Sequence, residues 1–343
     1  MSGKKILVTG GTGYIGSHTV VELINAGYVP VIIDNLSNSS PKIIDQIMKI
    51  TGTRPEFYNF DLCDEKLTRE FLEEHHDISG IIHFAAFKSV GESEREPLKY
   101  YKNNFYPLIN LLDSCSDRKM NLVFSSSCTV YGEPDLLPVN ELAPVKKAES
   151  TYGNTKQIAE EILEEVSGVS ENLKVIALRY FNPVGAHSTA LIGELPIGVP
   201  QNLVPFITQA AIGKRGAITV FGNDYNTSDG TCIRDYIHVV DLAKAHVAAI
   251  KQMENVQNVK KYDIYNIGTG TGYSVLEVIH AFESATGQKL NFTIGKRRAG
   301  DIEKIYGDVN KAEKELFWKA ELGIEDMMSS AWEWEKYIRE NPL

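Results

Sequence analysis

Short apolar runs alternate with longer amphipathic segments through the first half of the chain. Six runs have the length and β-branched content of strands, and they cover residues 6–9, 29–33, 56–60, 81–86, 122–127 and 175–180. Helix-compatible stretches separate them, and the first runs from Ser17 to Ala26 before Gly27 ends it. Strands that are apolar throughout and alternate with helices are typical of a parallel sheet covered on both faces. The pattern therefore predicts an α/β fold, a doubly wound parallel sheet of the Rossmann type.

The hydrophobic pattern changes after Tyr180, where a Gly- and Pro-rich stretch runs to about Pro200. We place a domain boundary there, with a dinucleotide-binding domain over residues 1–182 and a smaller mixed α/β substrate domain over residues 183–343. The substrate domain is discontinuous, since the chain returns to the first domain around 235–268. We expect a helix over 236–250 capped by Asp241, a strand ending at 265–268, and an amphipathic core-packing helix over 324–339.

A glycine-rich turn follows the first apolar run. Gly11, Gly13 and Gly16 give the spacing G-x-G-x-x-G between a predicted strand and a predicted helix. This spacing permits a tight turn and a close approach of a pyrophosphate to the helix N-terminus. Asp34 ends the second run, 18 residues after Gly16, where a carboxylate accepts hydrogen bonds from an adenosine ribose and repels a 2′-phosphate. The turn predicts a dinucleotide site that prefers NAD to NADP.

Ligands of doubly wound sheets lie at the carboxyl ends of the strands, so the residues just past each run are candidates. The polar loop 35–41 wraps the adenosine side, and Asp61 follows the third run near the adenine. Ala85 and Ala86 leave room for the pyrophosphate, and Lys88 lies just beyond them. Ser125 to Ser127 end the fifth run near the expected nicotinamide.

Tyr152 and Lys156 are four residues apart at the start of a predicted helix. That spacing puts them on one helix face with Cβ atoms about 5–6 Å apart. A tyrosine titrates near pH 10, so a phenolate at pH 7 requires about 4 kcal/mol of stabilisation. A nearby ammonium and an oxidised nicotinamide both act in that direction. We therefore expect Tyr152 to take a hydroxyl proton while hydride leaves for NAD+, with Ser127 hydrogen-bonded to the same oxygen.

Composition narrows the class of protein. The chain has 343 residues, 43% of them hydrophobic, and a formal net charge of −10, which argues against a nucleic-acid or anionic-membrane partner. Cys63, Cys115, Cys128 and Cys232 show no C-x-x-C spacing, so neither a metal site nor a disulfide framework is indicated. The first strand begins near residue 5 and no apolar run approaches the ~20 residues of a membrane helix. We expect a cytoplasmic protein.

Several longer motifs resemble the extended short-chain dehydrogenase/reductase family. They are Gly10-Gly11-Thr12-Gly13-Tyr14-Ile15-Gly16, Asp34-Asn35, the run from His83 to Ser93, Phe124-Ser125-Ser126-Ser127 and Tyr152-x-x-x-Lys156. The runs 179–187 and 229–239 are similar to the UDP-hexose 4-epimerases of that family, and the resemblance spans essentially the whole chain. It implies a tightly held NAD, transient oxidation of hexose C4 to a ketone, rotation of that ketone and return of hydride to its other face. UDP-glucose and UDP-galactose would thereby interconvert, in a homodimer formed through paired helices.

The resemblance also implies residue roles. Tyr152 is the general base, Lys156 the ribose-binding partner and Ser127 the ligand of the sugar hydroxyl. The residues implied to contact NAD are Gly10, Gly13, Tyr14, Ile15, Gly16, Asp34, Asn35, Leu36, Ser37, Asn38, Ser39, Asp61, Leu62, Phe84, Ala85, Ala86, Phe87, Lys88, Asn103, Tyr152, Lys156 and Phe181. Those implied to contact the UDP-sugar are Lys88, Ser127, Tyr152, Asn182, Asn202, Leu203, Phe221, Arg234, Arg298 and Asp301.

Other activities stay open. Related dehydratases and decarboxylases carry an acidic residue just after the strand-end serine or threonine, where this chain has Cys128-Thr129, so epimerisation is favoured. A UDP-hexuronate or UDP-N-acetylhexosamine 4-epimerase would use the same redox chemistry. Ile305 is intermediate between the bulky aromatic and the small residue that relatives place there, which leaves N-acetylated substrates open. A non-catalytic NAD-sensing module is a third alternative, although it needs no Ser127, Tyr152 and Lys156 together.

Overall fold

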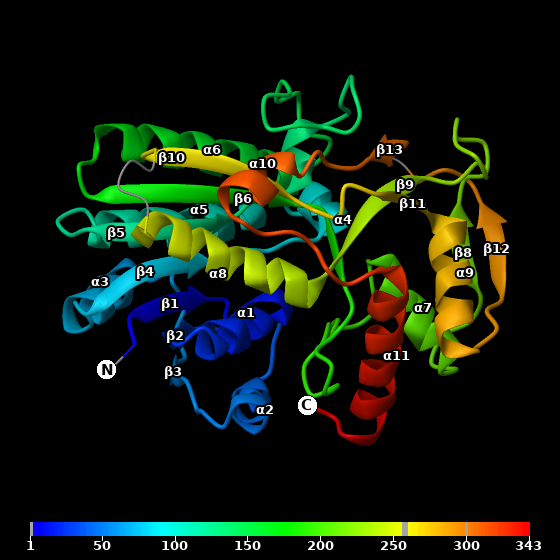
Figure 1. The fold of residues 1–343 in the computed structure, drawn as a ribbon, viewed down its shortest axis with the longest axis horizontal. Helices are drawn as coiled ribbons and strands as arrows, with labels where there is room; N and C mark the ends of the chain where they lie inside the picture. The colour runs from blue at the N-terminus through cyan, green and yellow to red at the C-terminus, as the bar shows by residue number, and fades with distance from the viewer. Residues whose placement is uncertain (1–2, 256–259, 299–300) are drawn as a thin grey trace.

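A parallel sheet forms the centre of the larger part of the molecule (Figure 1). The computed structural model describes residues 3–255, 260–298 and 301–343. Within these ranges seven strands lie in the order β10-β6-β5-β4-β1-β2-β3, and every neighbouring pair is parallel. They are β1 (Lys5–Thr9), β2 (Val29–Ile33), β3 (Glu56–Tyr58), β4 (Ile78–His83), β5 (Met120–Ser125), β6 (Leu173–Tyr180) and β10 (Tyr262–Ile267). The predicted doubly wound parallel sheet is confirmed.

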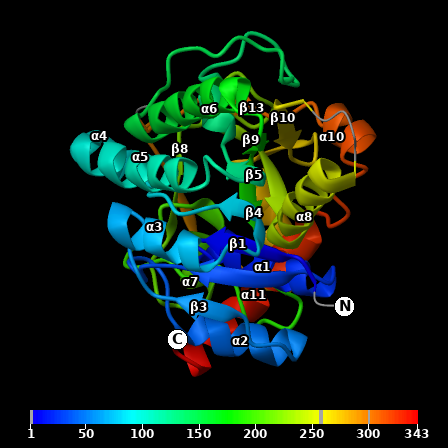
Figure 2. The ribbon, with the colours of Figure 1, turned by 90° about the vertical axis from the view of Figure 1, so that its left-hand side faces the viewer.

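Helices cover both faces of this sheet, as Figure 2 shows. One face carries α1 (Tyr14–Asn25), α2 (Lys42–Thr51) and α8 (Val239–Asn255), and the other carries α3 (Glu65–Glu74), α5 (Pro97–Ser114) and α6 (Thr151–Val169). Successive strand residues point to opposite faces, so Ile6 and Val8 pack with α1 and α8 while Leu7 packs with α5 and α6. Because both sides are buried, the strands are apolar throughout, which is the pattern visible in the sequence.

A smaller part, at the right of Figure 1, packs around a core of its own. Two small sheets belong to it: β9 lies between β11 and β13 and also pairs with β7, and β8 pairs with β12. The strands are β7 (Asn182–Val184), β8 (Ile218–Phe221), β9 (Ile233–His238), β11 (Gly272–Ser274), β12 (Phe292–Gly295) and β13 (Lys304–Ile305). Its helices are α7 (Leu203–Ala211), α9 (Val275–Thr286) and α11 (Ile324–Glu340). Three further short helices pack against the larger part: α4 (Val90–Arg95), η1 (Cys128–Tyr131) and α10 (Asn310–Glu315).

The chain returns from the smaller part to the larger part at β10. This strand lies beside β6 with Tyr262 opposite Val175 and Ile267 opposite Tyr180, so a segment that follows β9 and α8 completes the large sheet. The last helix, α11, contributes buried Met327, Met328 and Trp334 to the smaller part, as its amphipathic pattern predicts. None of the described helices has the length and apolar content that crossing a bilayer requires.

The predicted helix over 236–250 is wrong at its start. Residues 233–238 form β9, and the helix begins at Val239 and continues to Asn255. Asp241 lies in the first turn and does not cap it; its buried carboxylate accepts the backbone N–H groups of Glu321 and Leu322 at 2.9 and 2.8 Å. Apolar alternation through Tyr236-Ile237-His238-Val239 fits a strand as well as a helix, and pairing with β7 and β11 decides between them.

Candidate active site

The turn between β1 and α1 is a tight backbone cradle. Gly10 has φ +70, and its carbonyl accepts the N–H of Gly13 at 3.0 Å. A Cβ on Gly16 would lie 2.2 Å from the Gly10 oxygen, so the helix cannot pack this closely with any other residue there. No side chain caps α1, whose N-cap is Gly13, and the N–H groups of its first turn therefore face the space above the turn. This cradle fits a pyrophosphate.

Asp34 organises the adenosine side of the cradle. Its carboxylate accepts the N–H of Thr12 at 3.2 Å, the N–H of Leu36 at 2.9 Å and the hydroxyl of Ser39 at 3.2 Å. Asn35 continues the chain of contacts by donating to Asp61 at 3.0 Å. The structure thus brings the glycine turn, the 35–39 loop and Asp61 together. Ser37 and Asn38 are exposed, whereas the side chain of Leu62 is buried in the core beneath α3.

The loop after β4 lies against the glycine turn. Thr9 accepts the N–H of Phe84 at 3.1 Å through its carbonyl and that of Ala85 at 3.3 Å through its hydroxyl. At the far end of the loop, Asn104 of α5 accepts the N–H of Phe87 at 2.9 Å and donates to the hydroxyl of Thr155 at 3.0 Å. Sequence reasoning missed Asn104, the neighbour of the predicted Asn103. Its side chain ties the loop to α6.

The predicted catalytic side chains meet at the carboxyl end of β5. Tyr152, Lys156 and Ser127 are all buried, with 8, 4 and 7% of their surfaces exposed. The backbone N–H of Tyr152 donates to the hydroxyl of Ser93 at 3.1 Å, which fixes the start of α6 against α4. The Lys156 ammonium donates to the carbonyl of Ser125 at 2.6 Å. The site is therefore enclosed, and its charges are held in a medium of low polarity.

Burial dominates the ionisation of the pair. It lowers the pKa of Lys156 to about 7, against a smaller opposing effect of the Glu160 carboxylate. It also raises the pKa of Tyr152 well above the usual 10, and the side-chain hydrogen bond with Ser127 only partly opposes this. The prediction that Lys156 and an oxidised nicotinamide together lower the pKa of Tyr152 stays a prediction. Among the protein groups burial is the largest cause of the raised Tyr152 pKa, and the Lys156 ammonium is directed at the Ser125 carbonyl.

A cationic cluster lies in the smaller part of the molecule. Arg298 donates to Asp301 at 2.7 Å, and the guanidinium of Arg234 on β9 lies 3.8 Å from the same carboxylate oxygen. The Arg298 guanidinium is also 5.8 Å from the centre of the Phe221 ring at the end of β8. Arg234 acts on the site as well, because its charge opposes the rise that burial causes in the pKa of Cys128, the neighbour of Ser127. Two guanidinium groups share one carboxylate here, an arrangement suited to a diphosphate.

Lys88 and Asn202 form a separate cluster around Glu194. One carboxylate oxygen of Glu194 accepts the Lys88 ammonium at 3.2 Å and the Asn202 amide at 2.8 Å. The Lys88 ammonium lies 5.9 Å from the centre of the Tyr14 ring. Glu194 was not predicted from the sequence. In the described residues no hydrogen bond or ion pair joins this cluster to the Arg234–Arg298 cluster.

The other predicted substrate residues lie on neighbouring elements. Asn182 begins β7, and Leu203 begins α7 with its side chain half-buried in the core of the smaller part. Phe181 is buried with Cys128 and Ile305 in a cluster next to Ser127.

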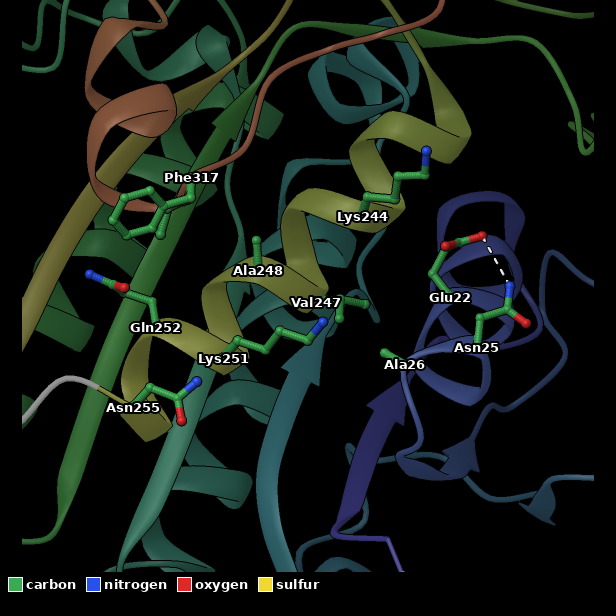
Figure 3. Close-up of a pocket in the computed structure, with 11 residues that line it drawn as sticks. Glu22, Asn25, Ala26, Lys244, Val247, Ala248, Lys251, Gln252, Asn255 and Phe317 are labelled. Carbon is green, nitrogen blue, oxygen red and sulfur yellow. Dashed lines mark hydrogen bonds between the residues drawn. The ribbon is translucent and has the colours of Figure 1, made fainter.

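A groove on the outer surface, drawn in Figure 3, contains none of the predicted site residues. Lys244 and Lys251 of α8 and Glu22 of α1 line it, and the exposed ring of Phe317 lies across α8 from α1. The candidate site is instead built at the carboxyl edge of the large sheet.

A dinucleotide cradle and a buried Tyr152–Lys156 pair at the same sheet edge define the class of the protein, the extended short-chain dehydrogenase/reductases. Comparison with known proteins agrees. A family model described as GDP-mannose 4,6 dehydratase matches residues 7–331. The chain is 50% identical over 336 residues to the UDP-glucose 4-epimerase of Dictyostelium discoideum, an alignment that covers 96% of this chain and 95% of the relative.

Two solved structures are similar throughout. The UDP-glucose 4-epimerase of Stenotrophomonas maltophila, with bound NAD and formylated UDP-arabinopyranose, is 45% identical with a TM-score of 0.94 and coverage of 98% of this chain and 99% of that one. The Bifidobacterium longum UDP-glucose 4-epimerase in complex with NAD+ and UDP is also 45% identical, with a TM-score of 0.92 and the same coverage. The chain belongs to the UDP-glucose 4-epimerase family.

Proposed function

We propose that the protein is an NAD-dependent isomerase that interconverts UDP-glucose and UDP-galactose, a step of galactose metabolism. One observation carries the proposal: Tyr152, Lys156 and Ser127 are buried together at the sheet edge that also holds the dinucleotide cradle. Relatives that are 45–50% identical along nearly their whole length and are called UDP-glucose 4-epimerases support it.

The geometry of the turn between β1 and α1 fits NAD. A Cβ at Gly16 would collide with the Gly10 carbonyl, and the uncapped first turn of α1 offers N–H groups to a pyrophosphate. Asp34 is a nearly buried carboxylate placed to accept ribose hydroxyls and to repel a 2′-phosphate. When bound, NAD+ supplies a hydride acceptor that returns the hydride to either face of the sugar carbon. The individual residues predicted to contact NAD, of which Gly10 is the first and Phe181 the last in the chain, stay proposals.

Tyr152 acts as the base in this proposal. It removes the proton of the hexose C4 hydroxyl and later returns it, while Ser127 hydrogen-bonds the same oxygen. Lys156 holds a ribose hydroxyl and provides positive charge next to the phenol. Because all three side chains are enclosed, water has little access to the ketone that forms at C4.

Arg234 and Arg298 would hold the diphosphate and Phe221 would contact the uridine, with Asn182, Asn202, Leu203 and Asp301 completing the set. The proximity of both guanidinium groups to Asp301 supports this, since it orients them toward one region. The boundary at residue 182 then separates an NAD-binding domain from a UDP-sugar-binding domain. Rotation of the ketone requires that the nucleotide stay bound while the hexose turns, which such an anchor on the smaller domain allows.

A homodimer formed through α5 and α6 is part of the proposal. Leu98, Tyr106 and Ile109 are exposed apolar residues along α5, between 47 and 71% accessible. Tyr101 of α5 accepts a hydrogen bond from Asn154 of α6 at 2.8 Å, which ties the two helices together.

We also propose a cytoplasmic location. Four unpaired cysteines agree with a reducing compartment of this kind.

The test is to incubate the purified protein separately with UDP-glucose, UDP-galactose, UDP-glucuronate and UDP-N-acetylglucosamine and to separate the products by chromatography. The proposal expects fast conversion of the first two sugars to each other and release of NAD on denaturation of the enzyme. Fast turnover of UDP-glucuronate without turnover of UDP-glucose would overturn it. Nucleotide release with no turnover of any sugar would favour an NAD-sensing module.

A further inference from the structure

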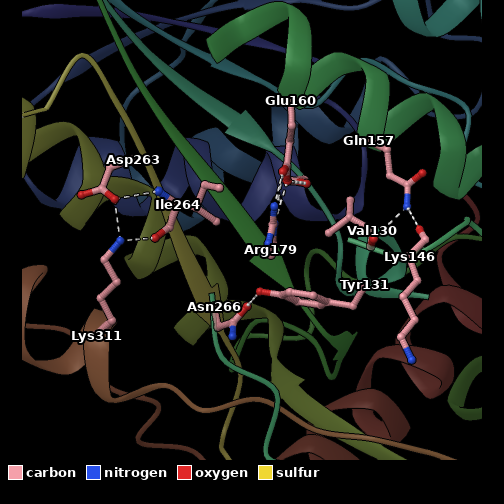
Figure 4. Close-up of polar contacts among 11 residues, drawn as sticks. Val130, Tyr131, Lys146, Gln157, Glu160, Arg179, Asp263, Ile264, Asn266 and Lys311 are labelled. Carbon is pink, nitrogen blue, oxygen red and sulfur yellow. Dashed lines mark hydrogen bonds and ion pairs between the residues drawn. The ribbon is translucent and has the colours of Figure 1, made fainter. Parts of the chain in front are cut away.

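Glu160 lies at the centre of a buried polar network behind the candidate active site. Figure 4 shows its carboxylate between α6 and β6, in contact with the guanidinium of Arg179. Arg179 donates through Nε at 2.9 Å and, through a second nitrogen, to the other carboxylate oxygen. Both side chains are almost fully buried, with 7 and 4% of their surfaces exposed. A buried ion pair of this kind is weak evidence of a gain in stability, because taking both charges out of water is costly.

The same carboxylate holds the end of β5. The hydroxyl of Ser126 donates to Glu160, and Ser126 lies between the two serines that contribute to the site. Ser125 accepts the Lys156 ammonium through its carbonyl at 2.6 Å and shares a hydrogen bond of 2.6 Å with the Tyr180 hydroxyl. The contact from Glu160 thus fixes the middle residue of a three-residue segment. On one side of it Ser125 contacts Lys156, and on the other is Ser127, the predicted ligand of the sugar hydroxyl.

Glu160 is also one helical turn after Lys156. Residues i and i+4 of a helix have Cβ atoms about 5–6 Å apart, and both of these side chains are buried, so solvent screens their interaction little. The Arg179 end of the network is held separately, since Arg179 packs 4.8 Å from the centre of the Tyr131 ring and Tyr131 donates to Asn266 at 2.7 Å (Figure 4).

We propose that Glu160 is a positioning residue for the reaction: it fixes the Ser125–Ser127 segment against α6 and supplies the negative charge that keeps Lys156 in its ammonium form. The inference rests on the proposed function, in which Lys156 acts as a cation beside Tyr152.

The other groups around Lys156 do not supply that charge. On its own helix Tyr152 is a neutral phenol, because burial raises its pKa. His83, at the end of β4, is neutral, because burial and Lys156 lower its pKa to about 3. Tyr180 of β6 is neutral, with a pKa that burial raises to about 12, and Arg179 of β6 is a cation. Among the described residues Glu160 is the group whose charge raises the pKa of Lys156.

Glu160→Gln tests the inference, because it removes the charge and keeps the shape of the side chain. Activity that needs the Lys156 ammonium declines as the pH rises through the pKa of Lys156. Without Glu160 that pKa falls, so we expect the alkaline limb of the kcat profile with UDP-galactose to move about one pH unit lower. Glu161→Gln removes an exposed carboxylate from the next position of α6 and should leave the profile in place. Glu160→Asp keeps the charge and should restore the position of the limb.

A uniform loss of kcat with the alkaline limb unmoved would show that Glu160 is only structural and would overturn the inference. Wild-type enzyme and Tyr152→Phe are assayed alongside, so that an absence of epimerase activity in the wild type is scored against the proposed function and not against Glu160.

Glu160→Gln leaves Arg179 without its partner, and Ser126→Ala covers the case in which that variant does not fold. Ser126→Ala removes only the hydroxyl that links Glu160 to β5 and leaves the ion pair intact. We expect its kcat to fall about tenfold while the KM for UDP-galactose and the retained NAD stay within about twofold. A kcat equal to that of the wild type would overturn the positioning role.

Discussion

The Lys156 ammonium lies 6.0 Å from the centre of the Tyr152 ring and only 2.6 Å from the carbonyl oxygen of Ser125. Its hydrogen-bond acceptor is therefore a backbone carbonyl and not the phenol oxygen. With the phenol buried as well, the protein groups keep Tyr152 protonated at neutral pH. Oxidised nicotinamide carries a positive charge that acts in the opposite direction. We infer that Tyr152 becomes an effective base only when the dinucleotide is in place.

Removal of the Tyr152 hydroxyl gives the most direct prediction. Tyr152→Phe keeps the buried ring and should retain NAD, because the cradle at Gly10 to Gly16 is untouched. Turnover of UDP-galactose should fall about 10²–10⁴-fold, the usual contribution of a general base. Nucleotide content is measured on the denatured protein and turnover by product separation. Tyr337→Phe, on α11, is the control, and equal turnover of the two variants would contradict the role of Tyr152.

Asp34 is predicted to select the cofactor. Asp34→Asn removes the repulsion of a 2′-phosphate and weakens the hydrogen bonds to Leu36 and Ser39 that shape the adenosine loop. A hydrogen bond to a charged group is worth about 1.5–3 kcal/mol, so NAD affinity should fall about 10–100-fold. The affinity for NADP should fall less or should rise.

Isothermal titration of nucleotide-free protein with NAD and NADP measures both changes. Asp45→Asn removes a charge from the exposed surface of α2 and serves as the control. An unchanged preference in Asp34→Asn would show that other residues choose between the two cofactors.

Local signals made much of the fold and the cradle predictable. Gly11 and Gly13 lie in the turn after β1, Gly16 lies in the first turn of α1 and Asp34 follows β2, so neighbouring residues alone indicate a strand-turn-helix unit. The position of Lys156 relative to Tyr152 likewise follows from a four-residue spacing. The ionisation of that pair did not follow, because it depends on burial and on the Ser125 carbonyl, neither of which the spacing contains.

Contacts between distant segments account for what was missed. Asn104 matters through Thr155 on another helix, and Glu194 through Lys88 and Asn202, and no periodicity in the sequence connects such partners. The start of α8 was misplaced because the apolar run before it satisfies two periodicities, and only the pairing of β9 with its neighbours resolves them. Tertiary context therefore decided each of these features.

Ile305 is predicted to limit the size of the sugar substituent. It is 3% exposed and packs with Cys128 and Phe181, the neighbours in sequence of Ser127 and Asn182. Ile305→Ala enlarges this region at a cost of about 2–4 kcal/mol in the free energy of unfolding. We expect kcat/KM for UDP-N-acetylglucosamine to rise at least about tenfold relative to that for UDP-glucose.

Val139→Ala provides the comparison, since it empties space in the same buried cluster from another segment. An equal gain in both variants would show that loosening of the cluster, and not the size of residue 305, controls the substrate.

Acid should unfold the protein through its buried neutral histidines, and His246 gives the sharpest test. Its Nδ1 lies 2.8 Å from the Leu242 carbonyl, its ring packs 4.6 Å from that of Phe84, and burial lowers its pKa from 6.5 to about 4. Between these two values the unfolded chain binds a proton that the folded chain does not, so the stability contributed by His246 is present above pH 6.5 and is lost as the pH falls toward 4.

His246→Phe keeps an aromatic ring at this position and removes the titration. In urea unfolding at pH 7.5, 6 and 5, its free energy of unfolding should decline less steeply than that of the wild type, by about 1.4 kcal/mol per pH unit below 6.5. His280→Gln, at an exposed position of α9, is the control for the loss of a histidine. Equal slopes for His246→Phe and wild type would mean that folding does not lower the pKa of His246.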